Sequence, residues 1–218
     1  MPEQRQPQMI LPSQALPGRD LPIESSSVHL VLGTPLAPPF PRNTESIAFG
    51  MGCFWGTEQV FWQLPEVYTT VAGYAGGFTP NPIYDEILTG KTGHAEVALV
   101  VYHPEVVSTL RLIKTFFESH NPTQYLRQGK DRGSHYRSVI LCTNESQYKL
   151  ANDVRLSHQL KLLRTGYGPI RTEIEMLDAF YFAEHFHQQY LSRNPHRNGG
   201  QAPLGVACDL GDETLAQG

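Results

Sequence analysis

A cysteine, Cys53, lies among three glycines and two aromatic residues in the stretch Gly50-Met51-Gly52-Cys53-Phe54-Trp55-Gly56. The apolar run at residues 46–49 predicts a strand before it, and apolar residues at helical spacing predict a helix after it that stops at Pro65. We therefore expect Cys53 at a strand-to-helix turn, where free N–H groups and the helix dipole favour thiolate over thiol. This setting predicts a nucleophile, although a lone cysteine is in general more often a small buried hydrophobe.

Glu96 is the candidate proton donor. It lies near the start of the almost continuously apolar run 94–102, which is typical of a strand covered on both faces. A carboxyl group there would be partly desolvated, and desolvation favours its neutral, proton-donating form. The alternative is a carboxylate that is merely solvated or ion-paired.

Four aromatic residues complete the candidate site. Tyr84 belongs to a turn-rich loop with a double glycine and paired prolines, and Tyr136 follows the polar loop 128–134. Their hydroxyls could hold an oxygen atom, although a packing role is an equally good interpretation. Phe54 and Trp55, next to the thiol, would form an apolar wall for a small methyl-like group.

The other two cysteines, Cys142 and Cys208, make the count odd and show no tight spacing with Cys53. This pattern disfavours a disulfide framework and a zinc cluster, and it fits a reducing compartment. We interpret Cys142, at the end of an apolar strand, as part of the core. Cys208 lies on a glycine-rich tail, from which it could reach an oxidised Cys53 and form a disulfide.

Composition disfavours several classes of function. The 218 residues carry a formal net charge of −4, and the 17 Lys and Arg residues are spread along the chain, so no basic patch for nucleic acid or an anionic membrane stands out. No apolar run approaches the length of a membrane span, and residues 1–30 lack the apolar segment of a signal peptide, so we expect a cytoplasmic protein. Glu184, His185 and His187 resemble a metal-ligand cluster, but residues two apart on a helix point to different sides, so no metal is expected.

Three parts of the chain are expected. Residues 1–45 hold nine of the 17 prolines, which predicts an extended arm. Leu30-Val31-Leu32 is the one place where this arm could dock on the core. Residues 46–194 form the catalytic domain, and residues 195–218 form a glycine-rich tail.

The patterns within the domain predict an α+β fold, a mixed sheet of about four to six strands with helices packed on it. Strands are expected near residues 46–49, 94–102, 138–141 and 170–176. One helix should begin at Pro104 with the core stripe Val106, Leu110, Ile113 and Phe117. A second should begin at a Thr143 cap and run to about residue 164. The pattern does not order the strands.

The stretch Gly52-Cys53-Phe54-Trp55-Gly56 resembles the signature of the peptide methionine sulfoxide reductase A family. Further stretches are similar to that family's other motifs, in the same order: Gly73-Tyr74-Ala75-Gly76-Gly77, Asn81-Pro82-Ile83-Tyr84, Thr92-Gly93-His94-Ala95-Glu96, Gly133-Ser134-His135-Tyr136-Arg137-Ser138, and Ala183-Glu184 with His187-Gln188-Gln189-Tyr190-Leu191. The resemblance covers about residues 46–208.

This resemblance implies reduction of the S epimer of methionine sulfoxide, free or in oxidised proteins, with thioredoxin as the reductant and no resident cofactor. It assigns the nucleophile to Cys53, the acid to Glu96, and the oxygen-binding hydroxyls to Tyr84 and Tyr136. Asp131 lies where the family has a polar residue lining the site. The family's fold is a two-layer α/β sandwich, and we expect a monomer.

In the implied mechanism, Cys53 attacks the sulfoxide sulfur and becomes a sulfenic acid, which Cys208 then resolves. Some members carry two recycling cysteines, and Gly200 stands here in place of the nearer one. One alternative is a cysteine hydrolase that pairs Cys53 with His94 or His187. A second is a non-enzymatic module that binds partners through the proline-rich arm.

Overall fold

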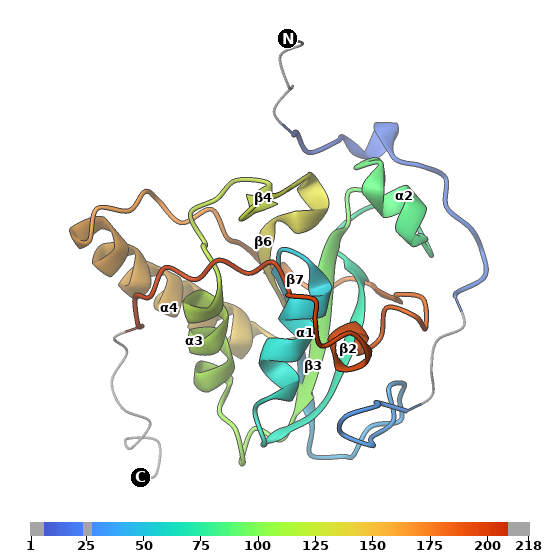
Figure 1. Cartoon of the computed structure of the whole chain (residues 1–218), viewed down its shortest axis with the longest axis horizontal. Helices are drawn as coiled ribbons and strands as arrows, with labels where there is room; N and C mark the ends of the chain where they lie inside the picture. The colour runs from blue at the N-terminus through green and yellow to red at the C-terminus, as the bar shows by residue number, and fades with distance from the viewer. Residues whose placement is uncertain (1–6, 24–27, 209–218) are drawn as a thin grey trace.

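A curved six-stranded sheet forms the centre of the protein (Figure 1). The computed structural model describes residues 7–23 and 28–208. The strand order is β7-β6-β1-β3-β2-β8; β6 and β7 run parallel, and all other neighbours run antiparallel. The strands are β1 (Glu45–Met51), β2 (Val67–Ala75), β3 (Ala95–Tyr102), β6 (Ser138–Cys142), β7 (Glu173–Met176) and β8 (Phe180–Phe182). The sequence-based prediction of a mixed sheet in an α+β fold is confirmed.

The helices α1, α3 and α4 lie on one face of the sheet and enclose the main core with it (Figure 1). The helices are α1 (Phe54–Trp62), α2 (Tyr84–Leu88), α3 (Thr109–Ser119), α4 (Glu145–Arg164) and α5 (Tyr190–Arg193), with short 3-10 turns η1 (Pro12–Gln14) and η2 (Ser134–Tyr136). A two-stranded hairpin pairs β4 (Arg127–Gln128) with β5 (Asp131–Arg132). None of the helices in the described ranges combines the length and the apolar character that crossing a membrane requires.

The strand β3 lies between β1 and β2, and all eight of its residues are buried. A strand with neighbours on both sides and packed layers above and below has no solvent-facing position, which explains its continuous apolar run. The prediction of a strand covered on both faces is confirmed. Its second residue, Glu96, is therefore carried into the interior by the strand itself.

Two predicted helix starts are wrong because a different residue supplies the cap. Ser108 caps α3 by accepting a hydrogen bond from the Arg111 N–H (3.1 Å), and Val106 lies before the helix with 63% of its surface exposed. Asn144 caps α4 by accepting from the Gln147 N–H (2.9 Å). Thr143 instead donates its hydroxyl hydrogen to a carbonyl of β1.

The predicted run Leu30-Val31-Leu32 contributes one backbone hydrogen bond to the docking of the N-terminal arm, from the Leu30 N–H to Gln189 Oε1 (3.2 Å), but other residues are buried. His29 Nδ1 accepts hydrogen bonds from the N–H groups of Val31 (3.1 Å) and Leu32 (3.0 Å), which closes a tight turn around the imidazole ring. This turn buries His29 and leaves Leu30 and Val31 57% and 48% exposed. Leu36 is fully buried and packs with the second, smaller core on the face of the sheet away from α1. The run therefore makes contact, but it is not the one docking place that the sequence predicts, because His29 and Leu36 are the buried residues of this part of the arm.

Candidate active site

Cys53 lies at the turn between β1 and α1, as the sequence predicts, and it is the N-cap residue of α1. The turn requires glycine at position 52, because Gly52 has a φ of +92° and an added Cβ would lie 2.6 Å from Gln128 Cβ. The Cys53 carbonyl accepts hydrogen bonds from the Thr57 N–H (3.3 Å) and from Gln201 Nε2 (3.0 Å). The tail therefore holds the backbone of the cysteine directly.

The thiolate expected at Cys53 is not the favoured form at rest. Burial raises the pKa of the Cys53 thiol well above its usual value of 9.0, and the carboxyl groups of Glu96 and Asp131 raise it further. The N–H groups of Trp55 and Gly56 at the start of α1 lower this pKa, in the expected direction, but they do not outweigh burial. Cys53 is a thiol in the resting site.

Glu96 is buried and keeps its proton at neutral pH. Its Oε2 accepts a hydrogen bond from the Phe54 N–H (3.0 Å), and Oε1 has no hydrogen-bond partner among the described residues. Burial raises the pKa of Glu96 from 4.5 to about 8, assisted by Asp131 and opposed by the Phe54 N–H. The expected neutral, proton-donating carboxyl group is therefore present, positioned by the first residue of α1.

Tyr84 and Tyr136 are half-buried, and both line the same cavity as Cys53. Tyr84 is the first residue of the short helix α2, which corrects the expectation that irregular backbone presents it. Tyr136 ends the 3-10 turn η2. Burial raises the pKa of both hydroxyls, and the charge that Glu96 carries once it ionises above about pH 8 raises it further, so both remain protonated hydrogen-bond donors at neutral pH.

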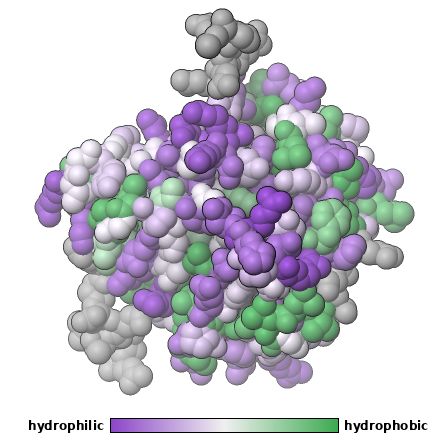
Figure 2. All heavy atoms as spheres, in the orientation of Figure 1, coloured by the Kyte–Doolittle hydropathy of each residue, from purple (hydrophilic) through white to green (hydrophobic). Residues whose placement is uncertain are grey.

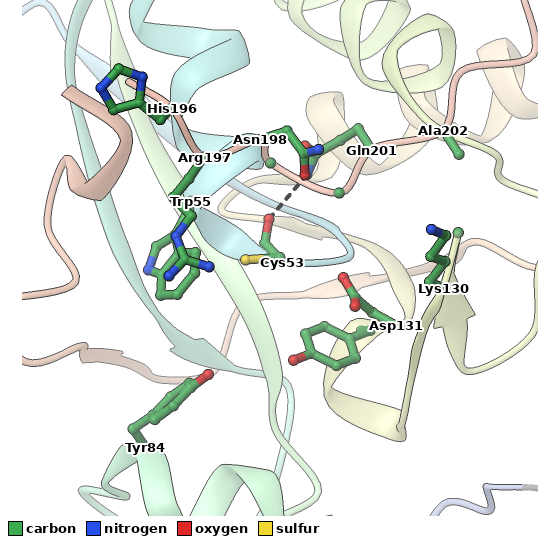
Figure 3. A pocket seen from close by; sticks show the side chains of 14 residues that line it. Cys53, Trp55, Tyr84, Lys130, Asp131, His196, Arg197, Asn198, Gln201 and Ala202 are labelled. Carbon is green, nitrogen blue, oxygen red and sulfur yellow. Dashed lines mark hydrogen bonds between the residues drawn. The ribbon is translucent and has the colours of Figure 1, made fainter. Parts of the chain in front are cut away.

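The cavity above Cys53 has a volume of about 810 Å³. Its walls come from the β1–α1 turn with Cys53 and Trp55, from the β4–β5 hairpin that carries Asp131, and from the tail residues 196–202. Figure 3 shows the Cys53 thiol and the Tyr84 hydroxyl directed toward the space beside Trp55, with Asp131 on the opposite side. Hydrophilic side chains gather near the middle of this face of the molecule, where the tail crosses in front of α1 (Figure 2).

Trp55, and not Phe54, forms the apolar wall of this cavity. Phe54 is fully buried and packs behind the site against Tyr74, Tyr84 and His187, with ring centroids 5.8, 6.4 and 5.1 Å away. Phe54 is not among the residues that line this cavity, because the first turn of α1 directs its side chain into the core, so its expected contact with substrate stays a prediction. The residue instead supports the ring of Tyr84 from behind.

Residues 184–190 hold Trp55 and Tyr84 in place, a role that the sequence did not reveal. Trp55 stacks on Tyr190, with ring centroids 3.9 Å apart, and its Nε1 donates a hydrogen bond to His187 Nδ1 (3.1 Å). Burial lowers the pKa of His187 to about 4, which keeps the ring neutral and able to accept this bond. In the sequence this segment is visible only as a cluster of aromatic and polar residues, and periodicity alone does not indicate which residues they contact.

Cys208 lies away from Cys53. It is buried with the main core, whereas Cys53 belongs to a separate cluster with Tyr84 and Phe54. The Cys208 N–H donates to Glu118 Oε1 (2.7 Å), which attaches this part of the tail to α3. Cys142 is fully buried in the main core, as the sequence predicts. The three cysteines form no disulfide in this state.

The two histidines that a cysteine hydrolase would use are engaged elsewhere. His94 Nε2 bonds the Thr79 carbonyl (2.7 Å), and His187 Nδ1 accepts from Trp55. No described hydrogen bond joins either ring to Cys53. Within the described residues, no group of three or more His, Cys, Asp or Glu side chains is arranged to hold a metal ion.

Comparison with known proteins agrees with this geometry. A family model described as peptide methionine sulfoxide reductase matches residues 45–206. The chain belongs to this family. A relative named peptide methionine sulfoxide reductase MsrA, from Rhodospirillum centenum, is 52% identical over 208 residues, which is 94% of this chain and 95% of the relative. A second, MsrA 1 from Synechocystis, is 49% identical over 94% of this chain and 92% of its own length.

Solved structures of the family share the fold. Methionine sulfoxide reductase A of Corynebacterium diphtheriae is 40% identical, with a TM-score of 0.84 over 94% of this chain and 100% of its own. Mxr1 from Saccharomyces cerevisiae in its reduced form is 30% identical, with a TM-score of 0.67 over 84% of this chain and 97% of its own. The resemblance recognised from the sequence motifs is confirmed.

Proposed function

We propose that this chain reduces the S epimer of methionine sulfoxide, free or in oxidised proteins, to methionine. The observation that carries the proposal is one cavity lined by Cys53, Tyr84 and Tyr136, with the neutral carboxyl group of Glu96 held beside Cys53 by the N–H of the next residue, Phe54. A nucleophile beside three groups that carry protons suits a reaction in which negative charge develops on an oxygen atom. Membership of the family supports the same reaction.

In the first step, the Cys53 sulfur attacks the sulfoxide sulfur. The S–O bond breaks, the oxygen passes to Cys53 as a sulfenic acid, and methionine leaves. The sulfoxide sulfur gains two electrons and the Cys53 sulfur loses two. Glu96 donates its proton to the developing oxyanion, while the two tyrosine hydroxyls hydrogen-bond it, and the Cys53 proton restores the neutral carboxyl group. Trp55 supplies the apolar wall for the methyl group of the substrate.

In the second step, the Cys208 thiol attacks the Cys53 sulfenic acid, which releases water and forms a disulfide. A dithiol then reduces this disulfide, and we propose thioredoxin for that role. The yeast relative Mxr1 has a structure in complex with Trx2, which supports this choice. Because the Cys208 N–H is bound to Glu118 of α3 at rest, Cys208 must leave Glu118 before the disulfide can form.

The remaining proposals follow from this cycle. The electrons come from cysteine thiols and an external dithiol, so the chain needs no resident cofactor and is suited to the reducing cytoplasm. The proposed cycle uses groups of one chain and needs no second copy, and we propose a monomer. We assign catalysis to residues 46–194, resolution to the tail 195–218, and support of the domain to the arm 1–45.

The test is methionine formation from separate S and R epimers of a methionine sulfoxide peptide with dithiothreitol. We expect turnover of the S epimer alone, and no turnover of either epimer by folded protein would refute the reductase assignment. Cys208→Ser should retain a first turnover and lose at least about tenfold of its thioredoxin-supported rate, whereas the matched variant Cys142→Ser should keep that rate. Normal thioredoxin-supported turnover by Cys208→Ser would contradict the role of Cys208.

A further inference from the structure

Glu184 joins the helix that carries Tyr84 to the strand beside Glu96. Its Oε1 accepts a hydrogen bond from the Tyr84 backbone N–H (2.9 Å), and its Oε2 accepts one from the Tyr74 hydroxyl (2.9 Å). Tyr74 lies in β2, directly opposite Glu96 of β3 in the register of the sheet. We propose that Glu184 is a positioning residue, which sets where the Tyr84 hydroxyl lies relative to Glu96 and Cys53.

The backbone of Tyr84 depends on this carboxylate. The N–H groups in the first turn of a helix have no partner within the helix and need an acceptor from elsewhere. Glu86 Oε2 accepts from the preceding Ile83 N–H (3.0 Å), so α2 supplies its own acceptor one residue earlier. For Tyr84 the acceptor comes from a segment 100 residues later in the chain. Loss of Glu184 therefore removes the acceptor of the Tyr84 N–H and loosens the backbone of the residue that carries the hydroxyl.

The second oxygen of Glu184 makes the bridge rigid. The Tyr74 side chain is fully buried and packs against Phe54, with ring centroids 5.8 Å apart, so its hydroxyl is a fixed donor. Phe54 also donates its N–H to Glu96. One side chain thus connects α2 to the same group of residues that orients the proposed acid.

Packing restrains the ring of Tyr84, while Glu184 holds its backbone N–H. His187, three residues after Glu184, lies against the Tyr84 ring with centroids 4.4 Å apart. The Phe54 ring stacks on the Tyr84 ring with centroids 6.4 Å apart. These contacts limit rotation of the ring, and the buried Ile87 and the Arg19–Glu86 ion pair anchor the later residues of α2, so Glu184 is the contact that holds its first residue. Catalytic groups lose effect when they are displaced by about 1 Å, so a shift of this residue should reduce the rate.

The test is a double-mutant cycle, and it rests on the proposed role of Tyr84 in holding the oxygen. The kcat for the S epimer with dithiothreitol is measured for Glu184→Ala and Glu184→Gln, each in the natural sequence and together with Tyr84→Phe. Glu175→Gln, an exposed carboxylate on β7, is the matched control and should keep the kcat of the natural protein.

We expect Glu184→Ala to lower kcat about tenfold or more in the natural sequence and by less than about twofold beside Tyr84→Phe, because the lost function is that of the hydroxyl. Glu184→Gln should stay within about threefold of the natural protein. Its amide oxygen accepts from Tyr84, and its NH₂ donates to the Tyr74 hydroxyl, which can also act as an acceptor. A merely structural role would not produce this dependence on Tyr84.

Three results would overturn the inference: an equal loss from Glu184→Ala in both backgrounds, a Glu184→Gln loss as large as that of Glu184→Ala, or an unchanged kcat in Tyr84→Phe alone. S-epimer turnover by the natural protein would still support the proposed function in each case. If Glu184→Ala does not fold, Tyr74→Phe loosens the carboxylate instead. It should then lower kcat only when the Tyr84 hydroxyl is present, and an additive loss would refute the proposal.

Discussion

Replacing Glu96 with glutamine should make the protein more stable at neutral and alkaline pH while removing its activity. The carboxyl group is buried, with Oε1 lacking a partner, and its pKa is raised to about 8 by that burial. Glutamine has nearly the same shape and can still accept the Phe54 N–H, but it never ionises. The substitution therefore removes the cost of keeping an ionisable group in the interior.

The magnitude follows from the difference between the two pKa values. Below pH 4.5 the carboxyl group is protonated in both the folded and the unfolded chain, so the two proteins should show the same pH dependence there. Between pH 4.5 and about 8 the unfolded chain has lost the proton while the folded protein keeps it. Each pH unit in this window lowers the free energy of unfolding of the natural protein by about 1.4 kcal/mol relative to the variant. The accumulated difference is about 3 kcal/mol at pH 7 and about 5 kcal/mol above pH 8.

The assay is urea unfolding of the natural protein and Glu96→Gln at a series of pH values from 4.5 to 9, analysed as a difference between the two proteins. This difference cancels the contribution of Glu58, a second buried glutamate with a pKa raised to about 8, which both proteins share. Glu175→Gln, on an exposed part of β7, should show no such divergence.

Parallel stability curves across this pH range would refute the reasoning, because they would mean that Glu96 is already ionised in the folded protein. It could then not act as the acid at neutral pH. If the reasoning holds, the single-turnover rate of the natural protein should fall as the pH rises through about 8. Glu96→Gln should be slower by about 100-fold or more and should lack that fall.

Two further predictions concern the thiol and the tail. Because burial raises its pKa, Cys53 should react with iodoacetamide at pH 7 more slowly than a model thiol, and a faster reaction, followed by peptide mass analysis, would contradict a protonated resting thiol. Gly56→Ala would place a Cβ 2.5 Å from Gly199 Cα and 1.7 Å from Gln201 Oε1, so it should displace the tail from α1. We expect a loss of about 1–3 kcal/mol in thermal or urea unfolding and faster proteolysis near residue 200, and unchanged values of both would show that the tail adjusts freely.

Much of the fold could be predicted from local patterns. The buried strand β3 and the turn at Cys53 follow from an apolar run and from glycines beside a helix start, which are properties of neighbouring residues. The starts of α3 and α4 were misplaced because a serine and an asparagine compete with nearby residues for the cap, and propensity does not decide between them. The docking of the arm was misplaced because a histidine turn buries His29 in place of its apolar neighbours.

The sequence by itself identified the residues that we propose for the chemistry, because Cys53, Glu96, Tyr84 and Tyr136 stand in motifs that a single chain displays. Only the tertiary structure decided their states and supports. Burial between layers from distant parts of the chain makes Glu96 neutral and Cys53 a thiol, and it reverses the preference that the helix start alone would give. Likewise, Tyr84 is held by Glu184, and Cys208 lies on α3 away from Cys53. These outcomes depend on contacts between segments far apart in sequence, which local periodicity does not encode.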